Sequence, residues 1–144
     1  MTDHDTNTRR RTNGWLLHPL ERNELLKLYP PRYADIVAHH VTLTSSFDKV
    51  DAPATTIGTI VGRVDDDNGI EAMIVEIAGS TNRPDGGTYH ITWSLDRSRN
   101  REAKESNDAI ERCGWQRFTA TREIELMPAY WERALSSCQL IVDS

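Results

Sequence analysis

The sequence contains few of the features that mark secreted, zinc-binding or membrane proteins. Among its 144 residues are 2 cysteines, Cys113 and Cys138, too few for a disulfide framework and without the close pairing of a zinc site. No apolar run approaches the roughly 20 residues of a membrane-spanning helix. The first residues are polar and acidic, unlike a secretory signal. We therefore expect a cytoplasmic protein in a reducing compartment, with no membrane segment and no metal.

The chain also lacks the positive charge of proteins that bind long nucleic acids. Its 17 Lys and Arg are outnumbered by 22 Asp and Glu, which gives a net charge of −5. This balance argues against broad electrostatic capture of RNA or DNA, but an enzyme that grips one terminal phosphate remains open. A Gly-rich phosphate loop and a Lys-centred nucleotidyl-transfer motif are both missing.

The order of predicted elements is typical of one α+β domain with antiparallel strands. Residues 1–13 have no apolar residue after Met1, so we expect a disordered tail followed by a single domain over residues 14–144. Apolar spacing and turn signals predict helices at 19–29 and 106–113. They also predict strands at 15–17, 36–44, 56–64, 70–78, 88–95, 122–127 and 139–142.

Two of these strands carry the same short pattern, an imidazole two residues before a hydroxyl. The patterns are His40-Val41-Thr42 and His90-Ile91-Thr92. Because strand side chains alternate between faces, each His shares a face with its Thr while the apolar residue between them points to the core. Half-buried structural residues on a strand, with Thr favoured there by β-propensity, are the alternative explanation.

These residue types suit the hydrolysis of a phosphate ester without a metal. Histidine titrates near neutral pH, so two of them on opposite sides of a phosphorus can serve as base and acid. The hydroxyls of Thr42 and Thr92 can donate hydrogen bonds to the charged oxygens that develop during the reaction. We therefore predict His40, Thr42, His90 and Thr92 as the catalytic set, with no cofactor.

A family resemblance is found in four stretches of the chain, residues 25–33 running into 38–43, then 89–93 and 103–107. The chain resembles the 2H phosphoesterase superfamily, and within it the cyclic phosphodiesterase domain of fungal-type tRNA ligases and its stand-alone bacterial and phage relatives. The resemblance implies two pseudo-symmetric lobes with a cleft between them and one motif in each lobe. It further implies that a 2′,3′-cyclic phosphate, on an RNA end or a small nucleotide, is opened to a 2′-phosphate. These 144 residues contain no ligase or kinase domain, so we expect the domain to act alone or with separate partners and do not infer a role in tRNA splicing.

Several other residues have two readings from sequence. The resemblance places Lys104 and Ser106 near the phosphate, although a helix cap beside a solvated lysine explains them equally well. Tyr33, in a Pro-rich loop, is a candidate for stacking on a base. His39 should face away from His40 if both lie in a regular strand.

Two other functions remain open from the sequence. One is hydrolysis of cyclic oligonucleotide signals, as in phage anti-defence members of the superfamily. The other is a non-catalytic module that binds RNA ends or nucleotides, which would not need two proton-transfer groups.

Overall fold

A computed structural model of the chain describes residues 10–46, 52–133 and 138–141. Within them lie two α-helices and eight strands, together with two short 3₁₀ turns. The helices are α2 (Pro19–Leu28) and α3 (Ser106–Cys113), and the 3₁₀ turns are η1 (Arg97–Arg99) and η2 (Ala103–Glu105). The strands are β1 (Arg10–Leu17), β2 (Asp35–Ile36), β3 (His40–Ser46), β4 (Ile57–Asp65), β5 (Ile70–Glu76), β6 (His90–Leu95), β7 (Gln116–Arg133) and β8 (Cys138–Ile141).

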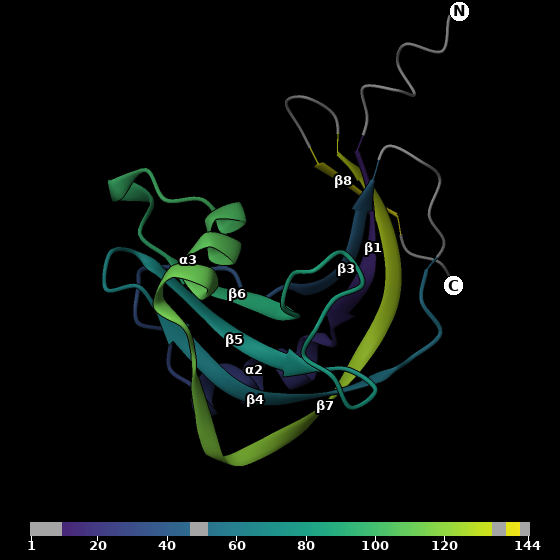
Figure 1. Cartoon of the computed structure of the whole chain (residues 1–144), viewed down its shortest axis with the longest axis horizontal. Helices are drawn as coiled ribbons and strands as arrows, with labels where there is room; N and C mark the ends of the chain where they lie inside the picture. The colour runs from purple at the N-terminus through teal and green to yellow at the C-terminus, as the bar shows by residue number, and fades with distance from the viewer. Residues whose placement is uncertain (1–9, 47–51, 134–137, 142–144) are drawn as a thin grey trace, which may run out of the picture.

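The strands form one antiparallel sheet, which confirms the α+β prediction. Their order is β2-β6-β5-β4-β7-β1-β3, and β8 pairs with β7. The sheet curls strongly, so that β3 at one end of this order approaches β6 near the other end (Figure 1). The sheet is continuous across β7. The described residues therefore form a single sheet, and the two lobes with a cleft that the resemblance implies are not seen as separate units.

Strand β7 joins the two halves of the sheet and is much longer than the segment 122–127 that the sequence predicts. Its residues 116–117 and 122–125 pair with β4 on either side of an irregularity in the register, and its residues from Leu126 to Arg133 pair with β1. On one side of β7, pairing with β4 ends at Glu125 and pairing with β8 begins at Tyr130. Pro128 lies in the gap between these two residues. A proline is tolerated there because its missing N–H leaves no ladder bond unmade on that side.

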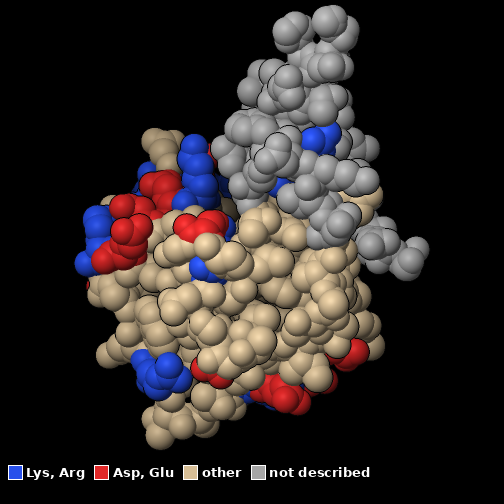
Figure 2. Space-filling model, turned by 45° about the vertical axis from the view of Figure 1, so that its right-hand side comes forward, with Lys and Arg blue, Asp and Glu red and all other residues tan. Residues whose placement is uncertain are grey.

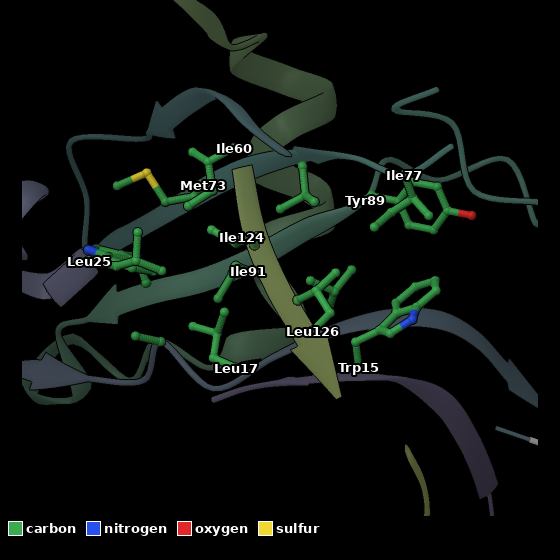
Figure 3. Packing of buried hydrophobic residues seen from close by; sticks show 14 residues of the cluster. Trp15, Leu17, Leu25, Ile60, Met73, Ile77, Tyr89, Ile91, Ile124 and Leu126 are labelled. Carbon is green, nitrogen blue, oxygen red and sulfur yellow. The ribbon is translucent and has the colours of Figure 1, made fainter. Parts of the chain in front are cut away.

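One face of the curled sheet carries the largest apolar cluster, to which strands from both halves contribute. Trp15 and Leu126 pack there with Ile91 and Ile124 (Figure 3). Leu25 of α2, which is fully buried, joins the same cluster. Burying this apolar surface is the main contribution to stability.

The two helices follow the sequence prediction closely. α2 begins with Pro19 at its first turn, and the Nδ1 atom of His18 accepts a hydrogen bond from the backbone N–H of Leu20 at 3.2 Å. α3 ends at Gly114, whose φ of 69° lies in the left-handed region that favours glycine. Neither helix in the described part of the chain combines the length and apolar character needed to cross a membrane.

Two predicted boundaries differ from the structure at the N-terminal part of the chain. The tail assigned to residues 1–13 is too long, because β1 already begins at Arg10 and pairs with β7; residues 1–9 lie outside the described residues. The strand expected at 36–44 is broken into β2 and β3. The break contains Ala38, whose φ of 42° is incompatible with a regular strand.

Candidate active site

The curl of the sheet brings the two motif strands together. His40 is the first residue of β3 and His90 the first residue of β6. Backbone hydrogen bonds tie the segment before the first motif to the second motif: the Val37 N–H donates to the Trp93 carbonyl and the Ala38 N–H to the Thr92 carbonyl, each at 2.9 Å. The start of β3 is therefore held against β6 independently of the side chains.

Both histidines and both threonines lie on the face of the sheet opposite the largest apolar cluster. The residues between them, Val41 and Ile91, are fully buried members of that cluster. Alternation along the strand then puts His40 with Thr42, and His90 with Thr92, on the other face. This is the arrangement that the spacing of the two motifs predicts.

His90 is buried and held in one tautomer. Its side chain belongs to a residue that is 9% exposed, and its Nδ1 lies 2.8 Å from the backbone carbonyl of Thr88. A carbonyl only accepts, so the proton of the neutral ring is on Nδ1 and Nε2 is left unprotonated. Burial lowers the pKa of His90, and the nearby charge of Arg83 lowers that pKa further, against the opposing effect of the Thr88 carbonyl. At neutral pH, Nε2 of His90 is therefore available to accept a proton.

His40 is also held uncharged at neutral pH. Its ring packs edge-on against Trp131 of β7, with ring centroids 5.0 Å apart. Burial lowers the pKa of His40 to about 4, and the charges of His39 and His90 lower it as well. Strands β3 and β6 lie in contact, and the charge of His90 contributes to the lowered pKa of His40.

The second motif makes direct contact with a predicted binding residue, Ser106. The Thr92 hydroxyl lies 2.8 Å from the Ser106 hydroxyl and donates to the Ala103 carbonyl at 3.3 Å. Ser106 is the first residue of α3 and is fully buried. Lys104, in η2 two residues earlier, has an exposed side chain. The 3₁₀ turn and the start of α3 therefore orient the Thr92 hydroxyl.

The first threonine lies where two strands approach unusually closely. Thr42 pairs with Gly14 of β1, next to an irregularity in the register. A Cβ atom on Gly14 would lie 2.1 Å from the Val41 carbonyl oxygen and 3.1 Å from the Thr42 Cα. Only glycine fits at this position without moving the strand that carries the first motif.

Tyr33 is held in a different cluster from the histidines. Its hydroxyl donates to Asp65 at 2.7 Å, and its backbone N–H donates to the Ser94 hydroxyl at 3.1 Å. The guanidinium of Arg32 lies 5.2 Å from the centre of the Tyr33 ring. Both the ring and its hydroxyl are thus engaged within the protein, which leaves the predicted stacking role without support from this placement.

This second cluster is a network of ion pairs that the sequence did not predict. At its centre is Glu71, 1% exposed, which accepts hydrogen bonds from Arg63 at 2.7 Å, from Ser94 at 2.7 Å and from the Arg32 N–H at 3.0 Å. Arg63 also pairs with Asp65 at 3.1 Å. The network borders a cavity of about 490 Å³, which Trp115 and Gln116 help to line. One feature of the sequence could have indicated this network: Glu71 is the single charged residue in the otherwise apolar strand 70–75.

The aspartates at the β4–β5 turn belong partly to the same network. The side chain of Asp66 is 2% exposed and pairs with Arg101 at 2.8 Å. Asp65 pairs with Arg32 at 2.5 Å. Among the described residues, no group of three or more His, Cys, Asp and Glu side chains is placed to hold a metal ion.

The ring of His39, the residue before the first motif, lies beside the ring of His40. His39 was expected to face away from His40, yet their Nδ1 atoms lie 3.1 Å apart and their ring centroids 5.3 Å apart. The expectation is wrong because His39 precedes β3 and follows the left-handed Ala38, so the alternation of a regular strand does not apply.

Arg83 is a charged residue near the site that sequence reasoning missed. Its side chain is 8% exposed and pairs with Asp85 at 2.5 Å. Its Nε atom has no hydrogen-bond partner in the part of the chain that the structure describes. The feature of the sequence that could have indicated Arg83 is its position in the loop that leads into the second motif.

Comparisons of the chain with protein-family models, with curated proteins and with solved structures give no match. A function for this protein is therefore inferred from its own residues and their geometry.

Proposed function

We propose that this protein is a metal-independent phosphodiesterase that hydrolyses 2′,3′-cyclic phosphates, on RNA ends or nucleotides, to 2′-phosphates. The observation that carries the proposal is the contact between β3 and β6, which brings the half-buried His40 and the buried His90, both uncharged at neutral pH, to one face of the sheet. Each has a hydroxyl two residues further along the same face. A structural role alone does not explain why both motifs lie together and why neither imidazole points into the apolar core.

The proton transfers follow from the tautomers. His90 has an unprotonated Nε2, because its Nδ1–H is donated to the Thr88 carbonyl, and this atom suits a general base that takes a proton from water. The hydroxide then forms a bond to phosphorus while the bond to the 3′ oxygen breaks. His40 gives a proton to that oxygen in the form of the protein in which the hydrogen-bonded His39–His40 pair holds one additional proton, so neither ring is left as an anion, and the 2′-phosphate remains.

Charge on the reacting phosphate is stabilised by groups around the second motif. The Thr92 hydroxyl is held in place by Ser106 and by the Ala103 carbonyl, and when substrate binds its single hydrogen turns from that carbonyl to a phosphate oxygen. Arg83 acts electrostatically on His90, and the exposed Lys104 is one residue from Ala103, whose carbonyl accepts from Thr92. Arg83 is paired with Asp85, so Lys104 is the group near the second motif that is proposed to attract the anionic substrate.

The proposal also divides the curled sheet into two functional halves. One half consists of β1, β3 and the C-terminal part of β7, and the other of β4, β5, β6 and the N-terminal part of β7. Each half contributes one motif strand. A cleft between two such halves is the substrate site that the 2H resemblance implies. The exposed free thiol of Cys113 fits a reducing, cytoplasmic setting.

The test is hydrolysis of a nucleoside 2′,3′-cyclic monophosphate in the presence of EDTA, with the product identified by phosphorus NMR. We expect the wild type to form the 2′-phosphate, and His40→Ala and His90→Ala to lose at least about 100-fold in turnover. His18→Ala, which removes a helix-cap acceptor outside the proposed catalytic set, is the matched histidine control and should not show this loss.

Other outcomes separate the remaining functions. Cleavage only of cyclic oligonucleotides would replace the substrate class but keep the histidine pair. Binding of nucleotides without turnover on mononucleotides, cyclic-phosphate RNA ends or cyclic oligonucleotides would show a binding module and refute the enzyme. Turnover that EDTA abolishes would refute the metal-independent mechanism.

A further inference from the structure

His39 contacts the nitrogen of His40 that does not face the proposed reaction. The two Nδ1 atoms lie 3.1 Å apart, within hydrogen-bond distance. One of these nitrogens must carry the shared proton and the other must be free. The imidazole of His40 is therefore bonded to a second titratable ring, whereas His90 is bonded to a backbone carbonyl, which never gives up or takes a proton.

The backbone fixes this contact firmly. The left-handed Ala38 is fully buried, and its N–H donates to the Thr92 carbonyl at 2.9 Å. Its carbonyl accepts from Nε of Arg22 at 2.8 Å, and Arg22 also donates to the Val37 carbonyl at 3.1 Å. A non-glycine residue persists in this conformation only when its surroundings hold it there. These bonds hold the turn that places the His39 ring beside His40.

The two rings differ in their access to water. His39 is exposed, whereas His40 is partly covered and packs on Trp131. Burial and then the charge of Arg22 of α2 lower the pKa of His39, whereas burial and then the charges of His39 and of His90 of β6 lower the pKa of His40 to about 4. A positive charge therefore costs less desolvation energy on His39 than on His40.

We propose that His39 supplies the proton that His40 transfers to the leaving oxygen. This inference rests on the proposed function. In the reactive state His39 carries protons on both nitrogens, and its Nδ1–H donates to Nδ1 of a neutral His40 that is protonated on Nε2.

During cleavage the Nε2 proton of His40 moves to the 3′ oxygen as the phosphorus–oxygen bond breaks. The Nδ1 proton of His39 moves to His40 at the same time. Both rings end neutral, and His39 regains its proton from water. The two rings thus form a single acid whose positive charge stays on the exposed member, and His39 is a positioning and proton-supplying residue rather than one that touches the substrate.

Two variants separate proton supply from simple positioning. In His39→Asn an amide N–H can still donate to Nδ1 of His40, but it has no proton to lose. In His39→Ala the bond is gone. If His39 supplies the proton, both variants lose about tenfold or more in kcat at pH 7, and the alkaline limb of the pH–rate profile moves to lower pH in both. If His39 only positions the ring, His39→Asn restores wild-type kcat and an unchanged profile, and the inference is overturned.

Nitrogen-15 NMR of the histidine rings tests the same inference without turnover. We expect wild-type His40 to be protonated on Nε2 at pH 7 and His39→Ala to shift its tautomer equilibrium. Protonation of His40 on Nδ1 in the wild type, unchanged in both variants, would refute the inference. A wild type with no activity on any substrate but the expected ring protonation would instead refute the proposed function while the proton-sharing pair stands.

Discussion

Replacing His40 with Gln should make the protein less sensitive to acid. His40 has a pKa of about 4 in the folded protein against an ordinary value of 6.5. Between these two values the unfolded chain binds more protons than the folded one, so the free energy of unfolding falls as the pH falls. The loss begins near pH 6.5 and is complete below pH 4.

The size of this loss follows from the difference in pKa. The difference between a pKa of 6.5 and one of about 4 corresponds to about 3 kcal/mol once the pH is below both values, and to about 2 kcal/mol at pH 5. His40→Gln loses the packing of the imidazole on Trp131, which lowers stability at every pH. A change in the slope of stability against pH reports on the titration of His40 and of the His39 ring in contact with it.

Urea denaturation at pH 7 and pH 5 measures that slope. The wild type should lose about 2 kcal/mol more than His40→Gln between these conditions. His90 contributes acid sensitivity in the same direction, because its pKa is also lowered, but it is present in both proteins and cancels in the comparison. Equal losses in the two proteins would show that His40 is not held uncharged by burial, and the electrostatic description of the site would be wrong.

Two further substitutions test the framework around the site. Glu71→Gln leaves Arg63 without its buried carboxylate partner, and we expect urea denaturation to show a loss of about 3 kcal/mol. Asp108→Asn, which removes the surface ion pair with Arg112, is the control, and we expect it to change the free energy of unfolding by less than about 0.5 kcal/mol. Equal losses in Glu71→Gln and Asp108→Asn would contradict the buried network. Gly14→Ala should destabilise the protein by about 1–3 kcal/mol, because its Cβ would meet a carbonyl at 2.1 Å. An unchanged denaturation midpoint would mean that β1 and β3 are further apart than described.

Local sequence determined the elements whose signals lie close together in the chain. Pro19 and the leucine spacing specify α2, and Gly114 specifies the end of α3. The hairpin of β4 and β5 follows from a turn that ends in Gly69, whose φ is 103°. The alternation of polar and apolar residues also placed each motif His on the face opposite the core. These features depend on a few neighbouring residues, and propensity and periodicity report on such residues directly.

Tertiary structure alone decided the features that depend on residues far apart. The length of β7 is set by β4 on one part and β1 on the other. Glu71 is buried because Arg63 and Ser94, from two neighbouring strands, satisfy it. The contact between His39 and His40 exists because the β6 backbone and Arg22 hold Ala38 in a left-handed conformation. Such long-range contacts override the strand alternation that neighbouring residues favour. The hydrogen bonds gained stabilise the fold by more than one residue loses in an unfavourable backbone conformation.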